Sequence, residues 1–508
     1  MHPLAKLDHA YVWHPFTQMR DWLQREPIVI LEGEGAVLRD VEGQEYLDAN
    51  SSIWTNLHGH CHLTINAAVQ RQLRKIAHSS ALGLANEPAS MLASKLVEAT
   101  QASAAGGRRI ADLRSGERPP APPAPPATPH LNKVFFSDDG STAMEVALKL
   151  AYEFARRRAP HRRPRFLSLD GAYHGDTVGA VSLGHIDLFH KAYAGLLFKS
   201  DIVMSPYCYR CPFNRAKPER ADARDYRQCH WQCVGKVEQR FATAGKRDQA
   251  YAAMVVEPLI QGAAGMIPQP AGWLRRVTEI VRGHGAQLIA DEVMTGFGRV
   301  GQPSCLTRSG AALALPLSGQ DAGPTLFACH HEGVQPDFLT VAKGLTGGYL
   351  PMAATLTTQR VFDAFLGQYG EFKTFFHGHS YTANQLGSAA ALASLEILRS
   401  KASLRDRRAL EETLRDELKS LWALPNVGDI RQVGLIVGVE LVRDWRTRAS
   451  FDLWERAGLR VCEGMARRGV LTRPIGNVVV LMPPYCTTKP QVRLMLAALH
   501  EACKELRC

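Results

Sequence analysis

Short apolar runs of β type alternate with helical segments through the central part of this chain, and this alternation constrains the fold more than any other feature. HLNKVFFSDDGSTAMEVALKLAYEFARRR indicates a strand, a turn and a helix, and RPRFLSLDGAYHGD indicates a strand followed by a loop. AYAAMVVEPLIQG, GAQLIADEV and DFLTVAK each contain a further β-type run, and AGWLRRVTEIVRGHG has a helical pattern. Strands that alternate with helices predict an α/β fold, in which helices cover a mainly parallel sheet.

The chain is 508 residues long, which is too long for one small core, so we expect at least two packed units. The α/β pattern falls within residues 86–375, which we predict to form the large domain. Residues 376–508 begin with helical pattern and end in short strands, which predicts a smaller α+β domain. Residues 1–85 are expected to contribute to this smaller domain and to the active site. Residues 101–130, which contain RPPAPPAPPATP, and residues 303–326 are interpreted as loop insertions without assigned chemistry.

Composition and charge argue against several classes of partner. The net charge is +11, but much of the excess lies in one block from Arg156 to Arg165 that lacks interleaved aromatic residues. We interpret this block as a solvated helix end and loop, so no nucleic-acid partner is expected. The N-terminus has no apolar core behind a basic leader, and no stretch approaches the roughly 20 apolar residues of a membrane span. We therefore expect a cytoplasmic protein without a membrane partner.

The cysteines do not indicate a disulfide scaffold, because there are eleven of them, scattered along the chain. One group stands out, in which Cys208 and Cys211 are followed by Cys229 and Cys233. Two close thiol pairs on a loop-rich segment resemble a structural zinc site. The alternative is a set of reduced thiols in an insertion loop, and we expect this alternative, with no bound metal.

A lysine and an aspartate stand at the ends of two predicted strands. Lys343 closes the apolar run 338–342, and Asp291 closes the run 287–290. Burial at a strand end lowers the pKa of a lysine and leaves its amine able to attack a carbonyl. Pyridoxal phosphate (PLP) requires such a lysine, and it requires a carboxylate that keeps its ring nitrogen protonated. Lys343 alone could be a lysine whose charged end reaches water. The pair favours a PLP enzyme.

The segment SDDGSTAMEVALKLA predicts a phosphate-binding turn. A strand runs into Gly140, Ser141 and Thr142, which open a helix, and exposed N–H groups at a helix start favour a phosphate. The alternative is an ordinary Ser/Thr helix cap. Because Asp138 and Asp139 would repel a phosphate, at least one of them must point away or toward an N–H group of the turn.

Two further residues have side chains suited to a cofactor or a substrate. Tyr173, in GAYHGDT, follows a strand and could stack on a pyridine ring, although a core tyrosine is the alternative. Arg473, in LTRPIGN, lies in a loop-like position where a guanidinium could bind a carboxylate through two hydrogen bonds. Taken singly, an arginine in such a position is most often a surface residue.

Nine motifs occur in this order over most of the chain: WHPFTQM, DANSSIWTNLHGHCH, FSDDGSTAMEVALKLA, GAYHGDT, VVEPLIQGAAGM, IADEVMTGFGRVG, VAKGLTGGYLP, FFHGHSYTANQLG and LTRPIGN. Together they resemble the class III (fold type I) PLP aminotransferases. WHPFTQM, HGHSYT and LTRPIGN are similar in particular to the members of this family that act in biotin biosynthesis. The resemblance implies a PLP-dependent homodimer that acts on small molecules, with active sites shared across the dimer interface.

The resemblance also implies a role for each matching position. Lys343 would carry PLP as a Schiff base, and Asp291 would pair with the pyridinium nitrogen. Gly140 and Ser141 would bind the phosphate, and Tyr173 would lie against the ring and the substrate. The remaining positions are Gln261 at the phenolic oxygen of PLP, Gly378, His379 and Ser380 on a segment that reaches across the dimer to phosphate and substrate, and Arg473 at the substrate carboxylate.

Two positions that line the substrate pocket in this family depart from its usual pattern. Phe16 stands where HPYT is common, and Ile53 precedes Trp54 where many members carry two tryptophans. The resemblance implies transfer of an amino group to 8-amino-7-oxononanoate, with S-adenosylmethionine as the default donor. Lysine is the alternative donor, because a branch that resembles this chain at WHPFTQM and HGHSYT uses it. Two more candidate functions are those of a class III aminotransferase of ω-amines and of a PLP-binding protein without turnover.

Overall fold

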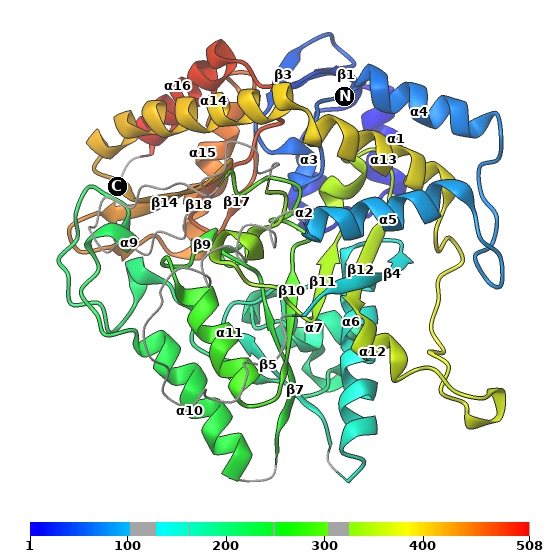
Figure 1. Ribbon diagram of the computed structural model, residues 1–508. Coiled ribbons are helices and arrows are strands. Elements are labelled where there is room, and N and C mark those ends of the chain that lie inside the picture. Colours follow the sequence, from blue (N-terminus) through cyan, green and yellow to red (C-terminus); the bar gives the residue numbers. More distant parts are fainter. Residues whose placement is uncertain (102–128, 162, 247–248, 303–324, 507–508) are drawn as a thin grey trace, which may run out of the picture.

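The structure is a computed structural model, shown in Figure 1. The insertions expected at 101–130 and 303–326 lie almost wholly outside the residues that it describes. The described residues are 1–101, 129–161, 163–246, 249–302 and 325–506.

A seven-stranded sheet forms the centre of the larger part of the molecule (Figure 1). The neighbours β6–β5, β5–β7, β7–β10 and β10–β11 are parallel, whereas β12 is antiparallel to both β11 and β4. The predicted α/β fold with a mainly parallel sheet is confirmed. The strand order is β4 (Leu131–Ser137), β12 (Ala353–Thr358), β11 (Phe338–Val341), β10 (Gln287–Asp291), β7 (Tyr251–Val256), β5 (Arg165–Leu169) and β6 (Asp201–Val203).

Helices cover both faces of this sheet, which explains why its central strands are continuous apolar runs. Every residue of β7, β10 and β11 is buried. In Figure 1, α6 lies on one side of the strands, and α10 and α11 lie on the other. No helix in the described ranges is both long enough and apolar enough to cross a membrane. The bounds are Gly140–Arg158 for α6, Gln232–Lys246 for α10 and Trp273–Gly283 for α11.

A second, antiparallel sheet is built from the C-terminal part of the chain. Helices α14, α15 and α16 pack on one another beside it (Figure 1). Sheet and helices together form a smaller α+β unit. The strands are β13 (Val427–Val433), β14 (Ile436–Asp444), β18 (Val478–Leu481) and β17 (Pro474–Ile475), with the short β15 (Ala449–Ser450) also paired to β14. The helices are α14 (Lys401–Leu418), α15 (Ala457–Ala466) and α16 (Lys489–Glu505).

The N-terminal segment joins the C-terminal part through a third sheet. Strands β1 (Ile30–Glu34), β2 (Val37–Asp40) and β3 (Glu45–Asp48) form a meander, and β16 (Val470–Leu471) adds to β3 in parallel. This pairing sets the residues that follow β3 beside the end of the central sheet. Helices α4 (Leu63–Leu73) and α5 (Glu87–Gln101) both pack on α13 (Gln385–Arg399).

Candidate active site

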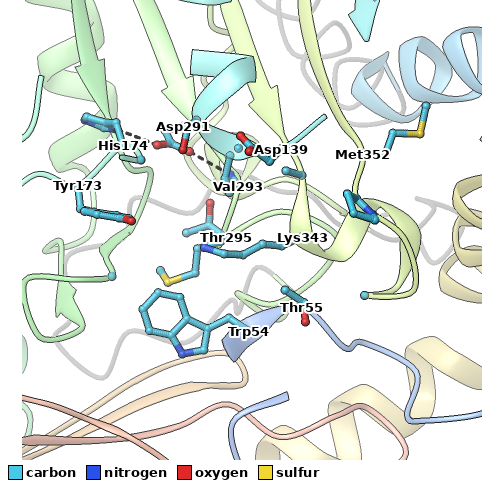
Figure 2. A pocket seen from close by; sticks show the side chains of 18 of the residues that line it. Trp54, Thr55, Asp139, Tyr173, His174, Asp291, Val293, Thr295, Lys343 and Met352 are labelled. Atoms are coloured by element: carbon cyan, nitrogen blue, oxygen red, sulfur yellow. Dashed lines mark hydrogen bonds and ion pairs between the residues drawn. The ribbon is translucent and has the colours of Figure 1, made fainter. Parts of the chain in front are cut away.

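A cavity of about 470 Å³ opens at the carboxyl ends of β10 and β11, where parallel α/β sheets collect their ligands. Lys343 lies two residues after β11, with a left-handed φ of 42°, and its side chain extends across the cavity (Figure 2). Its Nζ lies 4.9 Å from the centre of the Trp54 ring. Burial lowers the pKa of Lys343, while the carboxylates of Asp291 and Glu257 oppose that shift. The amine is thus easier to deprotonate than that of a surface lysine.

Asp291 ends β10 and faces the cavity together with His174. Its Oδ2 lies 2.7 Å from Nδ1 of His174, and its Oδ1 accepts a hydrogen bond of 3.1 Å from the N–H of Val293 (Figure 2). Burial acts to lower the pKa of His174, but the hydrogen bond and charge of Asp291 outweigh it and raise that pKa. Nε2 of His174 is buried and has no hydrogen-bond partner among the described residues. Asp291 is therefore held in one orientation by groups on two different loops.

The turn between β4 and α6 presents free N–H groups toward the same cavity. Asp139 caps the helix: its carboxylate accepts a hydrogen bond of 2.9 Å from the N–H of Thr142, and the Thr142 hydroxyl is held in the same capping box. One of the two aspartates therefore points to an N–H of the turn, as the sequence required. Within the described chain, the N–H groups of Gly140 and Ser141 have no acceptor, and both residues line the cavity. They are available to an anion.

Two glycines allow the close approach of the loops around this turn. A Cβ at Gly140 would lie 2.6 Å from Cγ1 of Val293. Gly175 has φ 122°, and a Cβ there would lie 2.2 Å from Oγ of Ser141. Because such contacts are too short for real atoms, any other residue would displace the turn.

Aromatic side chains form the opposite wall of the cavity. Tyr173 donates a hydrogen bond of 2.7 Å from its hydroxyl to Asp176, and its ring centre lies 6.3 Å from that of Phe189. Phe189 in turn lies 5.3 Å from Phe16, whose side chain is 61% exposed. Trp54 ends a run of left-handed residues that follows β3, and it packs against the buried cluster that contains Met294. Trp54 and Tyr173 line the cavity itself, and Phe189 and Phe16 continue outward from Tyr173.

Comparisons with known proteins identify the family of this chain. The family model "Aminotransferase class-III" matches residues 19–312 and 318–503. The chain belongs to the class III aminotransferases. A relative from Geobacter sulfurreducens, named adenosylmethionine-8-amino-7-oxononanoate aminotransferase, is 43% identical over 98% of this chain and 97% of its own length. A relative of the same name from Nitratidesulfovibrio vulgaris is 44% identical over 98% of this chain and 81% of its own length.

Solved structures agree with this aminotransferase fold over the whole chain. The crystal structure of adenosylmethionine-8-amino-7-oxononanoate aminotransferase from Methanocaldococcus jannaschii superposes with a TM-score of 0.81 and 37% identity, covering 99% of this chain and 98% of that one. An amine transaminase from an uncultivated Pseudomonas species, solved in its PLP-bound form, gives a TM-score of 0.80 at 31% identity over 97% of this chain and 98% of that one. The fold type I architecture expected from the sequence is confirmed.

The residues around the cavity fit the chemical groups of PLP. Free N–H groups at the start of α6 suit its phosphate, the carboxylate of Asp291 suits its ring nitrogen, and Lys343 suits its aldehyde. The buried Nε2 of His174, which lacks a partner, shows that the polar set around Asp291 is incomplete within the described chain alone. This aminotransferase therefore has a preformed binding site for the cofactor at the carboxyl end of its central sheet.

Some predicted site residues lie outside the immediate lining of the cavity. Gln261 is fully buried, and both ends of its amide are already bonded, Nε2 to the carbonyl of Asp170 at 3.0 Å and Oε1 to the Ser205 hydroxyl. Ile53 is 46% exposed beside Trp54. Arg473 is exposed in the link between β16 and β17, and Gly378 and Ser380 are exposed before α13. His379 lies nearer, with its Nδ1 3.6 Å from Oδ2 of Asp138, which lines the cavity.

The structure also adds a residue to the cavity that the sequence analysis did not single out. Glu257 follows β7, is buried, and accepts hydrogen bonds from the N–H groups of Gly262 at 2.7 Å and Tyr173 at 3.3 Å. Burial raises the pKa of Glu257 to about 7, while the charge of His174 opposes this shift. Its position after the apolar run AYAAMVV, at the same sheet edge as Asp291, was the available signal.

Proposed function

We propose that this class III aminotransferase uses PLP to transfer the amino group of S-adenosylmethionine to 8-amino-7-oxononanoate, giving 7,8-diaminononanoate for biotin biosynthesis. The observation that carries the proposal is the placement of Lys343 across one cavity from Asp291 and His174. The choice of substrate and donor is supported by the names of the full-length relatives from Geobacter and Methanocaldococcus. Omega transaminases from Pseudomonas jessenii share the fold at lower identity, 25%.

The chain's own groups have separate tasks in this proposal. Nζ of Lys343 would hold the cofactor and would move a proton to and from the reacting substrate carbon. Asp291, oriented by His174, keeps the cofactor ring nitrogen protonated. The N–H groups of Gly140 and Ser141 hold its phosphate. When bound, PLP supplies an electron sink for the negative charge that develops at the substrate carbon.

The substrate side of the cavity suits a long apolar acid. 8-Amino-7-oxononanoate presents a chain of methylene groups that ends in a carboxylate. Trp54 and Tyr173 line the cavity with Phe16 and Ile53 near its mouth, so apolar surface is available for the methylene groups. Arg473 lies two residues before Ile475 of β17, and Ile475 and Trp54 pack against the same buried cluster. We assign the substrate carboxylate to Arg473, whose guanidinium has no bonded partner within the described ranges.

We infer that the enzyme works as a homodimer in the cytoplasm. The adjoining segments 78–84 and 376–381 are joined by His78, whose Nε2 lies 2.9 Å from the carbonyl of Ser380. Large apolar side chains on these segments are exposed, and clusters of this kind mark protein interfaces. The segment with Gly378, His379 and Ser380 is thereby proposed to reach the partner's site. The exposed fractions are 92% for Leu82, 62% for Leu84, 74% for Phe376 and 62% for Tyr381.

We further propose that residues 86–375 form the large PLP-binding domain and residues 376–508 the small domain, with residues 1–85 shared between the small domain and the active site. The β3–β16 pairing and the presence of Trp54 in the cavity lining support the division. Limited proteolysis is expected to cut near residue 376 and to leave the two fragments associated, because β3 and β16 lie on different fragments and pair with each other.

The test is a donor half-reaction on purified, PLP-loaded enzyme. Adding S-adenosylmethionine alone should convert the visible absorbance of the lysine-bound cofactor to that of its amino form, and adding 8-amino-7-oxononanoate should reverse the change and yield 7,8-diaminononanoate. If lysine converts the cofactor absorbance and S-adenosylmethionine does not, lysine is the amino donor and 8-amino-7-oxononanoate remains the proposed acceptor. Conversion only by other ω-amines, with no reversal by 8-amino-7-oxononanoate, would overturn the proposed function.

A further inference from the structure

The connection between β6 and α10, residues 204–231, has little regular structure of its own. It contains one 3₁₀ turn, Cys208–Arg210, and one short helix, Ala223–Tyr226. Its local apolar cluster is small, and connections of this length without secondary structure are uncommon in compact domains. Something other than a local apolar core must therefore fix its path.

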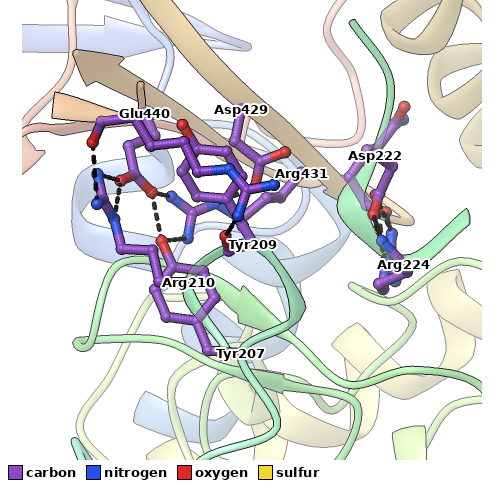
Figure 3. A network of polar contacts seen from close by, with 10 residues as sticks. Tyr207, Tyr209, Arg210, Asp222, Arg224, Asp429, Arg431 and Glu440 are labelled. Atoms are coloured by element: carbon purple, nitrogen blue, oxygen red, sulfur yellow. Dashed lines mark hydrogen bonds and ion pairs between the residues drawn. The ribbon is translucent and has the colours of Figure 1, made fainter. Parts of the chain in front are cut away.

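Buried charges fix one part of this connection to the C-terminal sheet (Figure 3). Arg210 pairs with Glu440 on β14 at 2.5 Å, and Glu440 also pairs with Arg431 on β13. Arg431 donates a hydrogen bond of 2.6 Å to the Tyr207 hydroxyl. These contacts hold residues 207–210 from one side. Further along, Arg220 donates a hydrogen bond of 2.6 Å to the carbonyl of Val427, and Arg224 donates one of 2.9 Å to that of Gln432. None of these contacts involves residues 229–231, which lead into α10.

Four cysteines meet at the other side of the connection. Cys208 and Cys211 come from the 3₁₀ turn and the residue after it, and Cys229 and Cys233 flank the start of α10. All four line one small enclosed cavity, so the two thiol pairs that were separate in the sequence face a common space. The other residues that line this cavity are Pro206, Asn214, Arg227, Trp231, Gln232 and Pro270.

The hydrogen bonds of these thiols are few and weak. Sγ of Cys208 lies 3.8 Å from the carbonyl oxygen of Pro206, and Nη1 of Arg227 lies 3.2 Å from Sγ of Cys229. Burial raises the pKa of the Cys208 thiol to about 12 and that of Cys233 to about 11, with smaller effects from neighbouring groups. Buried thiols of high pKa react slowly as nucleophiles, so Cys208 and Cys233 are poorly suited to redox exchange. Four sulfur donors around one space are instead a ligand set for a soft divalent cation.

We propose that Cys208, Cys211, Cys229 and Cys233 together bind one Zn²⁺ ion, which ties the second half of the connection to the first. The spacing of two residues in the first pair and three in the second falls within that of structural zinc sites, whose four thiolates surround the ion as a tetrahedron. In the described ranges, no group of three or more His, Cys, Asp or Glu side chains already stands in a metal-binding arrangement. Binding therefore includes rotation of the thiols about χ1, the one torsion that moves a cysteine sulfur between staggered positions.

The proposed ion acts on the structure and lies outside the catalytic cavity. Ser205, next to the cysteine cavity, donates a hydrogen bond to Gln261, and Gly262, the next residue, lines the catalytic cavity. Loss of the ion should thus loosen the connection first and affect turnover only through this contact.

Metal analysis of the full-length enzyme, purified without chelator, tests the proposal independently of any activity. We expect about one zinc ion per chain, in line with a closed four-cysteine site. Protein reconstituted with Co²⁺ should show strong sulfur-to-metal absorption. Cys229→Ser, a change at a half-buried position, should lose most of the zinc and lower the melting temperature by several degrees. Cys208→Ser, at a buried position, should do the same if it folds.

The matched control is Cys462→Ser, which alters a buried cysteine in α15, far along the chain from this cluster. It should keep its zinc and its Co²⁺ spectrum. Zinc well below one ion per chain in the wild-type enzyme, together with no Co²⁺–thiolate absorption on titration, would overturn the proposal. So would equal zinc content in Cys229→Ser and wild type. A disulfide between any two of the four cysteines in freshly purified enzyme would also contradict it.

Discussion

The catalytic cavity and the connection 204–231 hold their polar side chains in place by different means. In the cavity, Asp291 and Lys343 follow strands whose every residue is buried, so the sheet itself sets their positions. In the connection, pairs such as Arg210–Glu440 substitute for regular structure. A single substitution in the cavity should therefore abolish activity and leave the stability of the fold unchanged. A single substitution in the connection should lower the stability and leave the activity unchanged.

Lys343→Ala is expected to give the largest effect and to define the first half of this comparison. Turnover should fall by about 10³-fold or more, because the proposed covalent attachment and proton carrier are both lost. The melting temperature should change little, since the strand before the lysine is intact. Steady-state kinetics and calorimetry measure the two quantities. Lys236→Ala, in an exposed position on α10, is the control and should change neither. Turnover within tenfold of wild type would contradict the assigned role.

Arg431→Met should give the converse result. Arg431 is 1% exposed and lies between Glu440 and Asp429, with Nε 3.3 Å from Oδ2 of Asp429. Removing one member of a buried charge network leaves the others uncompensated, and the free energy of unfolding should fall by about 3–5 kcal/mol. Urea unfolding measures it, and kcat well below the melting temperature should stay within about twofold. Lys419→Met removes an exposed partner of Asp416 and should cost less than about 1 kcal/mol. An equal fall in the free energy of unfolding in both variants would contradict the special role of the buried charges.

Glu257 tests whether a buried carboxyl group in the cavity lowers the stability of the folded protein. Burial raises its pKa from 4.5 to about 7, so in this pH range the folded protein keeps a proton that the unfolded chain releases. The free energy of unfolding should therefore fall by up to about 3 kcal/mol as the pH rises from 4.5 to 7, and level off above that. Glu257→Gln should flatten this slope in unfolding curves taken at several pH values. An unchanged slope would be the contrary outcome, and exposed Glu412→Gln is the control.

Phe16→Ala should give the smallest effect. Phe16 is held mainly by its edge contact with Phe189, and an aromatic pair contributes about 0.5–1.5 kcal/mol. KM for 8-amino-7-oxononanoate should rise by about two- to tenfold while kcat changes little. Tyr369→Ala, at a position that is 94% exposed, should leave both constants unchanged. A fall in kcat without a change in KM would show that Phe16 does not act on substrate binding.

The same comparison explains how far the sequence could be interpreted. The central strands were predictable because burial on both faces makes them unbroken apolar runs, and a polar residue at the end of such a run stands out, as Asp291 and Lys343 do. β12, Ala353–Thr358, was not predicted, since it holds three threonines and follows a glycine-rich turn. The pairing of Arg431 with Tyr207 could not be predicted from the sequence, because partners so far apart along the chain leave no local pattern.

The parallel pairing of β3 with β16 has a consequence for the order of folding. It joins Leu47 to Val470, so the sheet that carries Trp54 into the cavity cannot close until residue 470 has left the ribosome. Contacts between such distant positions form slowly, and unpaired strand edges are prone to aggregate in the meantime. The segment around Leu47 is thus synthesised long before its partner at Val470 and is among the last parts to reach its place. Production in a cell should be limited at this step, and coexpressed chaperones should raise the yield of folded enzyme.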